Sequence, residues 1–319
     1  SGYRISPTEI EEAIHATQLV AEVAAFGVAH PVLGQAIVVL AVAILFILFF
    51  SVTNTIGQQN ELVTKKNKIT NKGKFFVYWG WNWASYSNSD IRFQGADYDF
   101  TLSNVRAQDR QTKFSVNSYF NPANITIPQT NYRIGYFFKE NYTVSVGVDH
   151  MKYVMIDDQN VTIDGEINIG NARYDGTYTG ENIQLAEDFL RFEHTDGLNY
   201  LNIEVKRFDN IDHWFGLELD NLQINITEGF GAGVLYPKTD TSLLGKERHD
   251  DYHLSGWGIS GGAGLNITFL KHFYIQADYK IGYINMPDIK TSLSAVDSAS
   301  QSFYFFQNNI LIGGKFRLF

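Results

Sequence analysis

Apolar and polar residues alternate along two neighbouring stretches in the last quarter of the chain. The first covers residues 259–269, and after the break Leu270-Lys271-His272 the second continues to Tyr283. A period of two is typical of a β-strand, and two such runs around a short break predict a hairpin. Each run has the length of a tilted membrane-crossing strand. One parity carries no charge whereas the other includes Asp278 and Lys280, which predicts a transmembrane β-barrel with apolar side chains toward lipid.

The same alternation recurs often enough to predict eight strands. They are centred on residues 75–84, 131–139, 142–148, 201–206, 222–234, 259–269, 273–283 and 309–318. Within the fifth run Glu228 interrupts the apolar parity, which predicts a bulge or a rim position.

The lengths of the connections indicate how the strands are arranged. The links between strands two and three, four and five, and six and seven are short or moderate. The other links are long and polar and cover residues 85–129, 157–188, 237–251 and 287–300. Short turns at one end and long loops at the other are typical of bacterial outer-membrane barrels. We therefore expect an all-β fold: an eight-stranded antiparallel transmembrane β-barrel over residues 73–319, with long extracellular loops.

A soluble, lipocalin-like barrel is the alternative. It would place apolar side chains inside and would not need outward Trp and Tyr at strand ends. In a membrane barrel of eight strands the lumen is just wide enough for side chains to fill it, and buried charges must pair. We therefore expect a salt-bridged plug and no open pore. Its members would be Arg133, Lys139, Asp149, Glu204, Lys206, Asp278 and Lys280.

The first residues of the chain have a different character. Ser6-Pro7-Thr8-Glu9 has the pattern of a helix capping box. Together with Gly2-Tyr3-Arg4-Ile5 before it and the stretch from Phe26 to Gln35, it resembles the small C-terminal domain of AMP-forming acyl-CoA ligases over residues 1–41. That resemblance implies an α/β fragment. The family's nucleotide-binding domain and catalytic lysine fall outside the matching stretch, so we expect an inert remnant or a spurious fusion.

An apolar, uncharged run from Ala36 to Val52 follows. It is at the lower limit for a membrane-spanning helix, and Thr55 and Gly57 are small residues of the kind that precede signal-peptide cleavage. We interpret residues 42–57 as a signal-peptide-like apolar helix and residues 58–72 as a polar linker. A retained inner-membrane anchor is the alternative. Because the chain begins with Ser, we expect a fragment, a processed chain or a missing start.

Composition narrows the possible functions. The 319 residues include 24 Phe, 18 Tyr and 5 Trp, a surplus that aromatic girdles at both membrane interfaces would use. A net charge of −9 argues against nucleic-acid binding. The absence of cysteine excludes disulfides and thiol catalysis. We expect neither a cofactor nor a metal.

The chain ends in Phe319, which is similar to the aromatic C-terminal signal that the barrel-assembly machinery reads, although Arg317 departs from the usual spacing. With its strands, loops and composition, the region from Phe75 onward resembles uncharacterised outer-membrane β-barrel proteins of the Bacteroidetes type. That resemblance implies a fold and an outer-membrane location, with outer-membrane lipid and the assembly machinery as partners, but no activity.

Two short motifs carry no function in this context. Gly256, Gly258 and Gly261 match the dinucleotide-binding fingerprint by letter, but the pattern lies inside a predicted strand and does not open a helix. Five Asn-x-Thr triplets have the form of glycosylation acceptors, and we interpret them as chance in an asparagine-rich chain. They begin at Asn124, Asn141, Asn160, Asn225 and Asn266.

Histidines near acidic residues mark the loop ends of several strands. A metal site or a His-Ser-acid hydrolase site would use such residues, but no fixed ligand spacing appears, and a solvated polar rim is the alternative. The candidate site residues are His150, His194, His253, Ser255, Glu193 and Asp251.

Three functions remain to be distinguished. The first is a non-enzymatic outer-membrane barrel whose long extracellular loops serve surface binding or structural support. The second is a rim-located lipid-modifying hydrolase similar to lipid A deacylases. The third is the AMP-forming ligase activity implied by residues 1–41.

Overall fold

The computed structural model divides the chain into two compact units, residues 1–64 and 65–319. It describes residues 12, 20–30, 34–43, 70–121, 124, 128–216, 221–246, 248–249 and 251–318.

The described part of the first unit is an antiparallel hairpin of β1 (Val20–His30) and β2 (Gly34–Ala43). β2 includes Val42 and Ala43, so the apolar helix expected at residues 42–57 is wrong at its first two residues. This stretch is rich in Val and Ile, whose branched side chains favour extended backbone. Most of the expected helix at 42–57, and the linker at 58–72 up to residue 69, lie outside the described residues. Within the described residues no helix has the length and apolar character needed to cross a bilayer.

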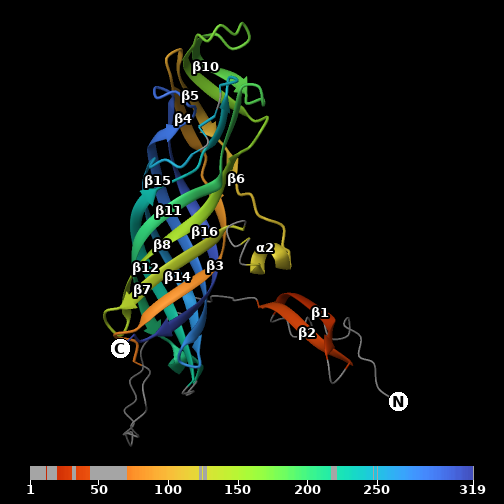
Figure 1. Cartoon of the computed structure of the whole chain (residues 1–319), viewed down its shortest axis with the longest axis vertical. Helices are drawn as coiled ribbons and strands as arrows, with labels where there is room; N and C mark the ends of the chain where they lie inside the picture. Colours follow the sequence, from red (N-terminus) through yellow and green to blue (C-terminus); the bar gives the residue numbers. More distant parts are fainter. Residues whose placement is uncertain are drawn as a thin grey trace, which may run out of the picture. The chain divides into compact units, whose positions relative to one another are not determined.

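The second unit contains a closed barrel of eight antiparallel strands (Figure 1). Each strand pairs with the next in the ring, and the last pairs with the first. In ring order the strands are β3 (Phe75–Tyr86), β7 (Thr130–Phe137), β8 (Tyr142–Met155), β11 (Leu190–Asn210), β12 (Leu222–Leu235), β14 (Gly256–Phe269), β15 (Phe273–Lys290) and β16 (Ser298–Phe316). All eight predicted strands are thus confirmed, and the fold is an eight-stranded transmembrane β-barrel.

The side chains of the barrel alternate as predicted. On β15, Ile275, Tyr279 and Ile281 are exposed on the outer wall, while Asp278 and Lys280 are buried inside. This is the arrangement of a wall with lipid outside and a polar interior. We call this part of the molecule the membrane barrel.

Toward the end of the barrel opposite the C-terminus, the chemical character of the two faces reverses, and apolar side chains face inward. On β8 the inward row changes from Ser145 and Asp149 to Met151, Tyr153 and Met155, all buried. On β15 the inward row likewise continues into buried Ile284, Met286 and Ile289. These upper ends therefore have an apolar interior, as a water-soluble protein does.

The long connections form strands of their own at this end, opposite the C-terminus (Figure 1). The added strands are β4 (Ser89–Gln94), β5 (Tyr98–Val105), β6 (Ala107–Gln108), β9 (Asn160–Ile167), β10 (Gly176–Gln184) and β13 (Asp240–Leu243). A continuous sheet runs from β16 through β4, β5 and β9 to β10. We call these strands and the upper ends of the barrel strands the extracellular extension.

The extracellular extension has its own hydrophobic core. Phe93, Phe100 and Phe192 are fully buried there. The ring centroids of Phe93 and Phe100 lie 5.4 Å apart, and those of Phe93 and Phe192 lie 5.7 Å apart. The segments predicted only as polar loops are therefore packed structure in large part.

Two finer points of the prediction are corrected by the structure. Of the bulge and the rim position predicted for Glu228, the bulge is wrong, because the pairing of β12 with β11 and β14 is continuous through Glu228, which faces outward near Arg207. Lys139 lies exposed in the turn between β7 and β8, outside the predicted interior plug. Its ammonium instead lies 5.8 Å from the ring centre of Tyr142, where water can still solvate the charge.

Candidate functional site

The interior of the membrane barrel contains a connected network of ion pairs. Lys206 Nζ lies 2.6 Å from Asp278 Oδ2 and 3.4 Å from Glu204 Oε1. Lys280 Nζ lies 2.7 Å from Asp149 Oδ2 and 3.5 Å from Glu204 Oε2. Opposite charges thus alternate around the lumen.

Arg133 completes this network from β7. Its guanidinium lies 3.7 Å from Asp149 Oδ1 and 3.9 Å from Glu204 Oε1, and Nη2 donates to Asn202 Oδ1 at 2.6 Å. The six residues Arg133, Asp149, Glu204, Lys206, Asp278 and Lys280, which we call the ionic plug, are all buried. Three cations and three anions balance, as burial of charge requires, so the plug fills the lumen with paired charge.

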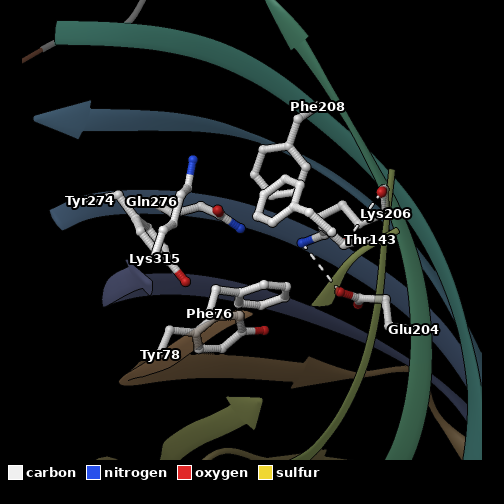
Figure 2. A pocket seen from close by; sticks show the side chains of 10 residues that line it. Phe76, Tyr78, Thr143, Glu204, Lys206, Phe208, Tyr274, Gln276 and Lys315 are labelled. Carbon is white, nitrogen blue, oxygen red and sulfur yellow. Dashed lines mark hydrogen bonds and ion pairs between the residues drawn. The ribbon is translucent and has the colours of Figure 1, made fainter. Parts of the chain in front are cut away.

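Aromatic side chains lie in the barrel next to the plug (Figure 2). Lys315 Nζ donates to Thr268 Oγ1 at 2.9 Å. The same ammonium lies 5.3, 5.4 and 5.5 Å from the ring centres of Phe137, Phe208 and Tyr274. Cation–π attraction of this kind stabilises a charge that water does not reach.

These aromatic side chains line a small cavity together with Glu204 and Lys206 of the ionic plug. Figure 2 shows Lys315, Gln276 and Tyr274 on one side of it and Lys206 and Glu204 on the other. It has room for about one water molecule. A cavity of this size, lined in part by aromatic rings, admits no substrate or cofactor.

The candidate histidines lie on the side of the ionic plug nearer the extracellular extension, and each of them has a different environment. His194 on β11 is completely buried in the core of the extracellular extension. Its Nδ1 lies 2.9 Å from Thr239 Oγ1, and its ring packs against Tyr153 and Phe192. Burial lowers the pKa of this histidine to about 3, so His194 is a neutral core residue.

His150 on β8 is half-buried beyond the last inward charge of that strand. Its Nδ1 lies 2.8 Å from Asn199 Oδ1 on β11. This contact bridges two neighbouring strands across the outer face. A side chain held in this way contributes to strand pairing.

His253 forms the arrangement closest to a catalytic one. Its Nε2 lies 2.9 Å from Asp288 Oδ2, and both side chains are partly exposed. Partial burial acts to raise the pKa of Asp288, but hydrogen bonds from His253 and Lys290 outweigh it and lower that pKa. Ser255 Oγ donates to the backbone oxygen of His253 at 3.3 Å, so the hydroxyl is not aligned with the imidazole as a nucleophile would be.

The two acidic candidates have other roles. Glu193 is buried and forms two ion pairs. Its Oε2 lies 2.8 Å from Arg110 Nη2, and its Oε1 lies 2.9 Å from Arg191 Nη2. Asp251 is exposed and accepts a hydrogen bond from Tyr252 N at 2.8 Å. Across the described residues, no group of three or more His, Asp or Glu side chains could hold a metal ion.

Three residues that contact the candidate residues were not predicted from the sequence: Asp288, Thr239 and Arg110. Asp288 follows Pro287 just beyond the predicted end of its strand, and no local pattern joined it to His253. Thr239 and Arg110 come from connections that were predicted as loops. An apolar parity that reverses after Tyr283 was the available signal that β15 continues beyond the membrane.

The outward surface of the extracellular extension is polar. On β10 all residues but Tyr178 and Ile183 are exposed, including Thr177, Thr179 and Asn182. Nearby, Arg92 on β4 binds Asp99 on β5 through two hydrogen bonds of 2.8 and 2.7 Å. This surface is a hydrogen-bonded β-sheet whose exposed side chains can donate and accept hydrogen bonds.

No known family model matches the chain, and neither does any curated protein. Among solved structures it is similar to outer membrane protein OprG from Pseudomonas aeruginosa, with 12% identity and a TM-score of 0.35 over 78% of this chain and 98% of OprG. The attachment invasion locus protein Ail of Yersinia pestis has 10% identity and a TM-score of 0.22, over 75% and 99% of the two chains. The outer membrane protease OmpT of Escherichia coli has 8% identity and a TM-score of 0.21, over 76% of this chain and 96% of OmpT. The fold assignment rests on the strand pairing and side-chain placement described above.

Proposed function

Taking the chain as an outer-membrane β-barrel protein, we propose that it is a non-enzymatic anchor that holds the extracellular extension above the membrane as a surface for binding. The observation that carries this proposal is the second hydrophobic core. A core of buried aromatics makes the extension rigid, and a rigid polar sheet presents its side chains in one fixed arrangement, which lowers the entropy cost of binding.

The ionic plug supports an anchor in preference to a channel. Six paired charges fill the lumen, and moving one of them would leave its partners buried without compensation. Purified protein in planar bilayers is expected to show no steady ion conductance. A stable ohmic conductance would contradict the proposal.

The binding surface can be tested on intact cells. Thr177, Thr179 and Asn182 are exposed on β10, and replacing all three with Ala should leave the core intact. Cells displaying the protein are expected to adhere to immobilised glycans or extracellular proteins, and the triple variant should lose that adhesion. Lys139→Ala, exposed at the opposite end of the barrel, is the matched control. Equal adhesion by the parent, the triple variant and cells without the protein would remove the binding role.

A rim-located lipid-modifying hydrolase is the second candidate. The hydrogen bond between His253 and Asp288 favours it, because a carboxylate that orients an imidazole is a recurring part of hydrolase sites. Lipid A composition can be compared in cells carrying His150→Ala, His194→Ala, His253→Ala or Asp288→Asn. A lipid change in the last two variants would support the hydrolase, and unchanged lipid in all of them would remove it.

Three finer assignments remain proposals. The relation to Bacteroidetes barrels rests on the general resemblance alone. If residues 1–41 had the activity of AMP-forming ligases, the protein would form acyl-adenylates from ATP. Failure to bind ATP would contradict that activity. Recognition by the barrel-assembly machinery is proposed for β16, the strand that closes the barrel on β3; Phe319 itself lies outside the described residues.

A further inference from the structure

One part of the barrel wall is not closed by a strand. β7 pairs with β3 only as far as Thr130, opposite Trp81. Both neighbours of β7 continue upward, β3 to Tyr86 and β8 to Met155. The edges of β3 and β8 therefore face each other above the end of β7, and we call residues 82–86 and 150–153 the seam.

Side chains bridge the seam where a strand would otherwise lie. Asn82 Nδ2 donates to His150 O at 3.1 Å, and Tyr86 Oη donates to Lys152 O at 2.8 Å. Lys152 N donates to Gln129 Oε1 at 3.0 Å. His150 is the last residue of β8 that pairs with β7, so the two bonds to Lys152 satisfy backbone groups that β7 does not reach, as buried polar groups require.

The segment that follows β6 returns along the free edge of β3. Asp109 Oδ2 accepts a hydrogen bond from Ala84 N at 2.8 Å. Gln111 Nε2 donates to Asn82 O at 3.3 Å. We call residues 109–120, which end in the short helix α2 (Val116–Phe120), the flap. In Figure 1 α2 lies beside the barrel wall.

The flap is anchored on the lipid-facing side of β3. The ring of Tyr119 lies 5.8 Å from that of Trp81, an outward residue of the membrane barrel, and Tyr119 is buried. The ring of Phe114 lies 5.2 Å from that of Tyr119. Phe114 remains 73% exposed and Val116 70% exposed. Phe114 and Val116 thus extend the apolar outer wall away from the barrel, beside the exposed polar side chains of Lys113, Ser115 and Asn117.

We propose that the flap is a lipid-contacting element, with acyl chains of the outer leaflet packed on Phe114 and Val116. Its continuity with the outward row Trp79, Trp81 and Trp83 assigns the occupant, because that row already faces lipid. Aromatic residues that alternate with basic and polar residues, as Phe114 does with Lys113 and Ser115, favour the membrane–water boundary. Lipid on the flap would also cover the outer side of the seam and keep water from its hydrogen bonds.

The chain has no cysteine, so single cysteines can carry an environment-sensitive fluorophore. The full chain in phosphatidylcholine vesicles would be labelled at Phe114→Cys. Ile281→Cys on the outer wall and Thr177→Cys on β10 serve as the lipid-facing and water-facing controls. Brominated phosphatidylcholine is expected to quench the label at position 114 to nearly the extent seen at 281, while aqueous iodide quenches strongly only at 177.

Two results would overturn the proposal. One is quenching at position 114 by iodide to the extent seen at 177. The other is quenching at 114 that depends on a second labelled copy of the chain and not on brominated lipid, which would assign this face to self-association. Val116→Cys provides an independent label if Phe114→Cys prevents folding. Because lipid contact does not require the extracellular extension to bind anything, this test is separate from those of the anchor proposal.

Discussion

The membrane barrel and the extracellular extension are built from the same long strands, yet their side chains are arranged in opposite senses. Along β16 the inward row reads Ala299, Gln301, Phe303 and Phe305 in the extension and then changes to Gln307 and Asn309 in the barrel. The outward row changes from serines to aromatic and aliphatic residues over the same stretch, with Asn308 as the one polar residue among them. Solvent accounts for the difference: lipid stabilises an apolar outside, whereas water favours an apolar inside.

The two regions are stabilised by different contributions. In the membrane barrel apolar side chains gain little by moving from lipid into the interior, so closure of the backbone ladder and pairing of the interior charges hold the structure. In the extracellular extension burial of apolar area from water is the main favourable term. Substitutions of the same chemical type should therefore differ in effect between the two regions.

The largest effect is expected from breaking the ionic plug. Glu204→Gln removes the carboxylate that contacts Arg133, Lys206 and Lys280, and breaking a buried pair costs about 3–5 kcal/mol. Glu166→Gln, exposed on β9, is the matched control and should change stability by less than about 0.5 kcal/mol. Urea unfolding in lipid vesicles measures both. Equal effects at the two sites would show that the plug does not stabilise the barrel.

A comparable but local loss is expected in the core of the extension. Phe100→Ala leaves a cavity beside Phe93 and Phe189, which costs about 3–5 kcal/mol. The extension should become sensitive to protease while the barrel keeps its heat-modifiable migration on gels. Simultaneous loss of both would mean that the two regions unfold as one unit.

An added charge on the outer wall should cost more where the wall faces lipid than where it faces water. Ala277→Lys places an ammonium midway along the lipid-facing row of β15, which runs from Phe273 to Tyr283, and this costs about 2–4 kcal/mol near the bilayer midplane. Ser302→Lys points outward on the neighbouring strand in the extension and should cost less than about 1 kcal/mol. Folding yields into vesicles compare the two, and a similar cost at both positions would contradict the proposed boundary.

A smaller, pH-dependent effect is expected from His194. Its pKa is about 3 in the folded chain and 6.5 when unperturbed, because burial disfavours the charged form. Above pH 6.5 both states hold a neutral ring; below it the unfolded chain takes up a proton that the folded chain does not, so stability falls as the pH drops toward 3. His194→Asn, which can retain the contact with Thr239, should flatten the change in protease sensitivity between pH 7 and 5. An unchanged profile would exclude His194 as its source.

The membrane barrel was largely predictable from the sequence because its signal is local. The alternation around Ile275 and Lys280 repeats in every strand, and length and parity suffice to assign strand and orientation. The extension was not predicted, because β4, β5, β9 and β10 are short and polar on their outward faces. Such segments resemble loops unless the core they share is known.

The candidate site was predicted less well for a different reason. The environment of His194 is formed by Tyr153, Phe192 and Thr239, which come from β8, β11 and the segment before β13. Phe192 is on the same strand as His194, but Tyr153 and Thr239 come from distant segments that the sequence next to His194 does not report. All six residues of the ionic plug were predicted, because parity places them inside the barrel. Lys139 was wrongly included, since it lies in the turn after β7.

The reversal along a single strand is tested most directly by cysteine scanning of β16 in a chain that has no cysteine of its own. Outward residues Ser300, Ser302, Phe306 and Ile310 would be replaced one at a time, and each variant would be exposed in vesicles to a membrane-impermeant thiol reagent. We expect full modification at positions 300 and 302, and none at 306 and 310 until the vesicles are dissolved. Equal modification at positions 302 and 310 would contradict the account.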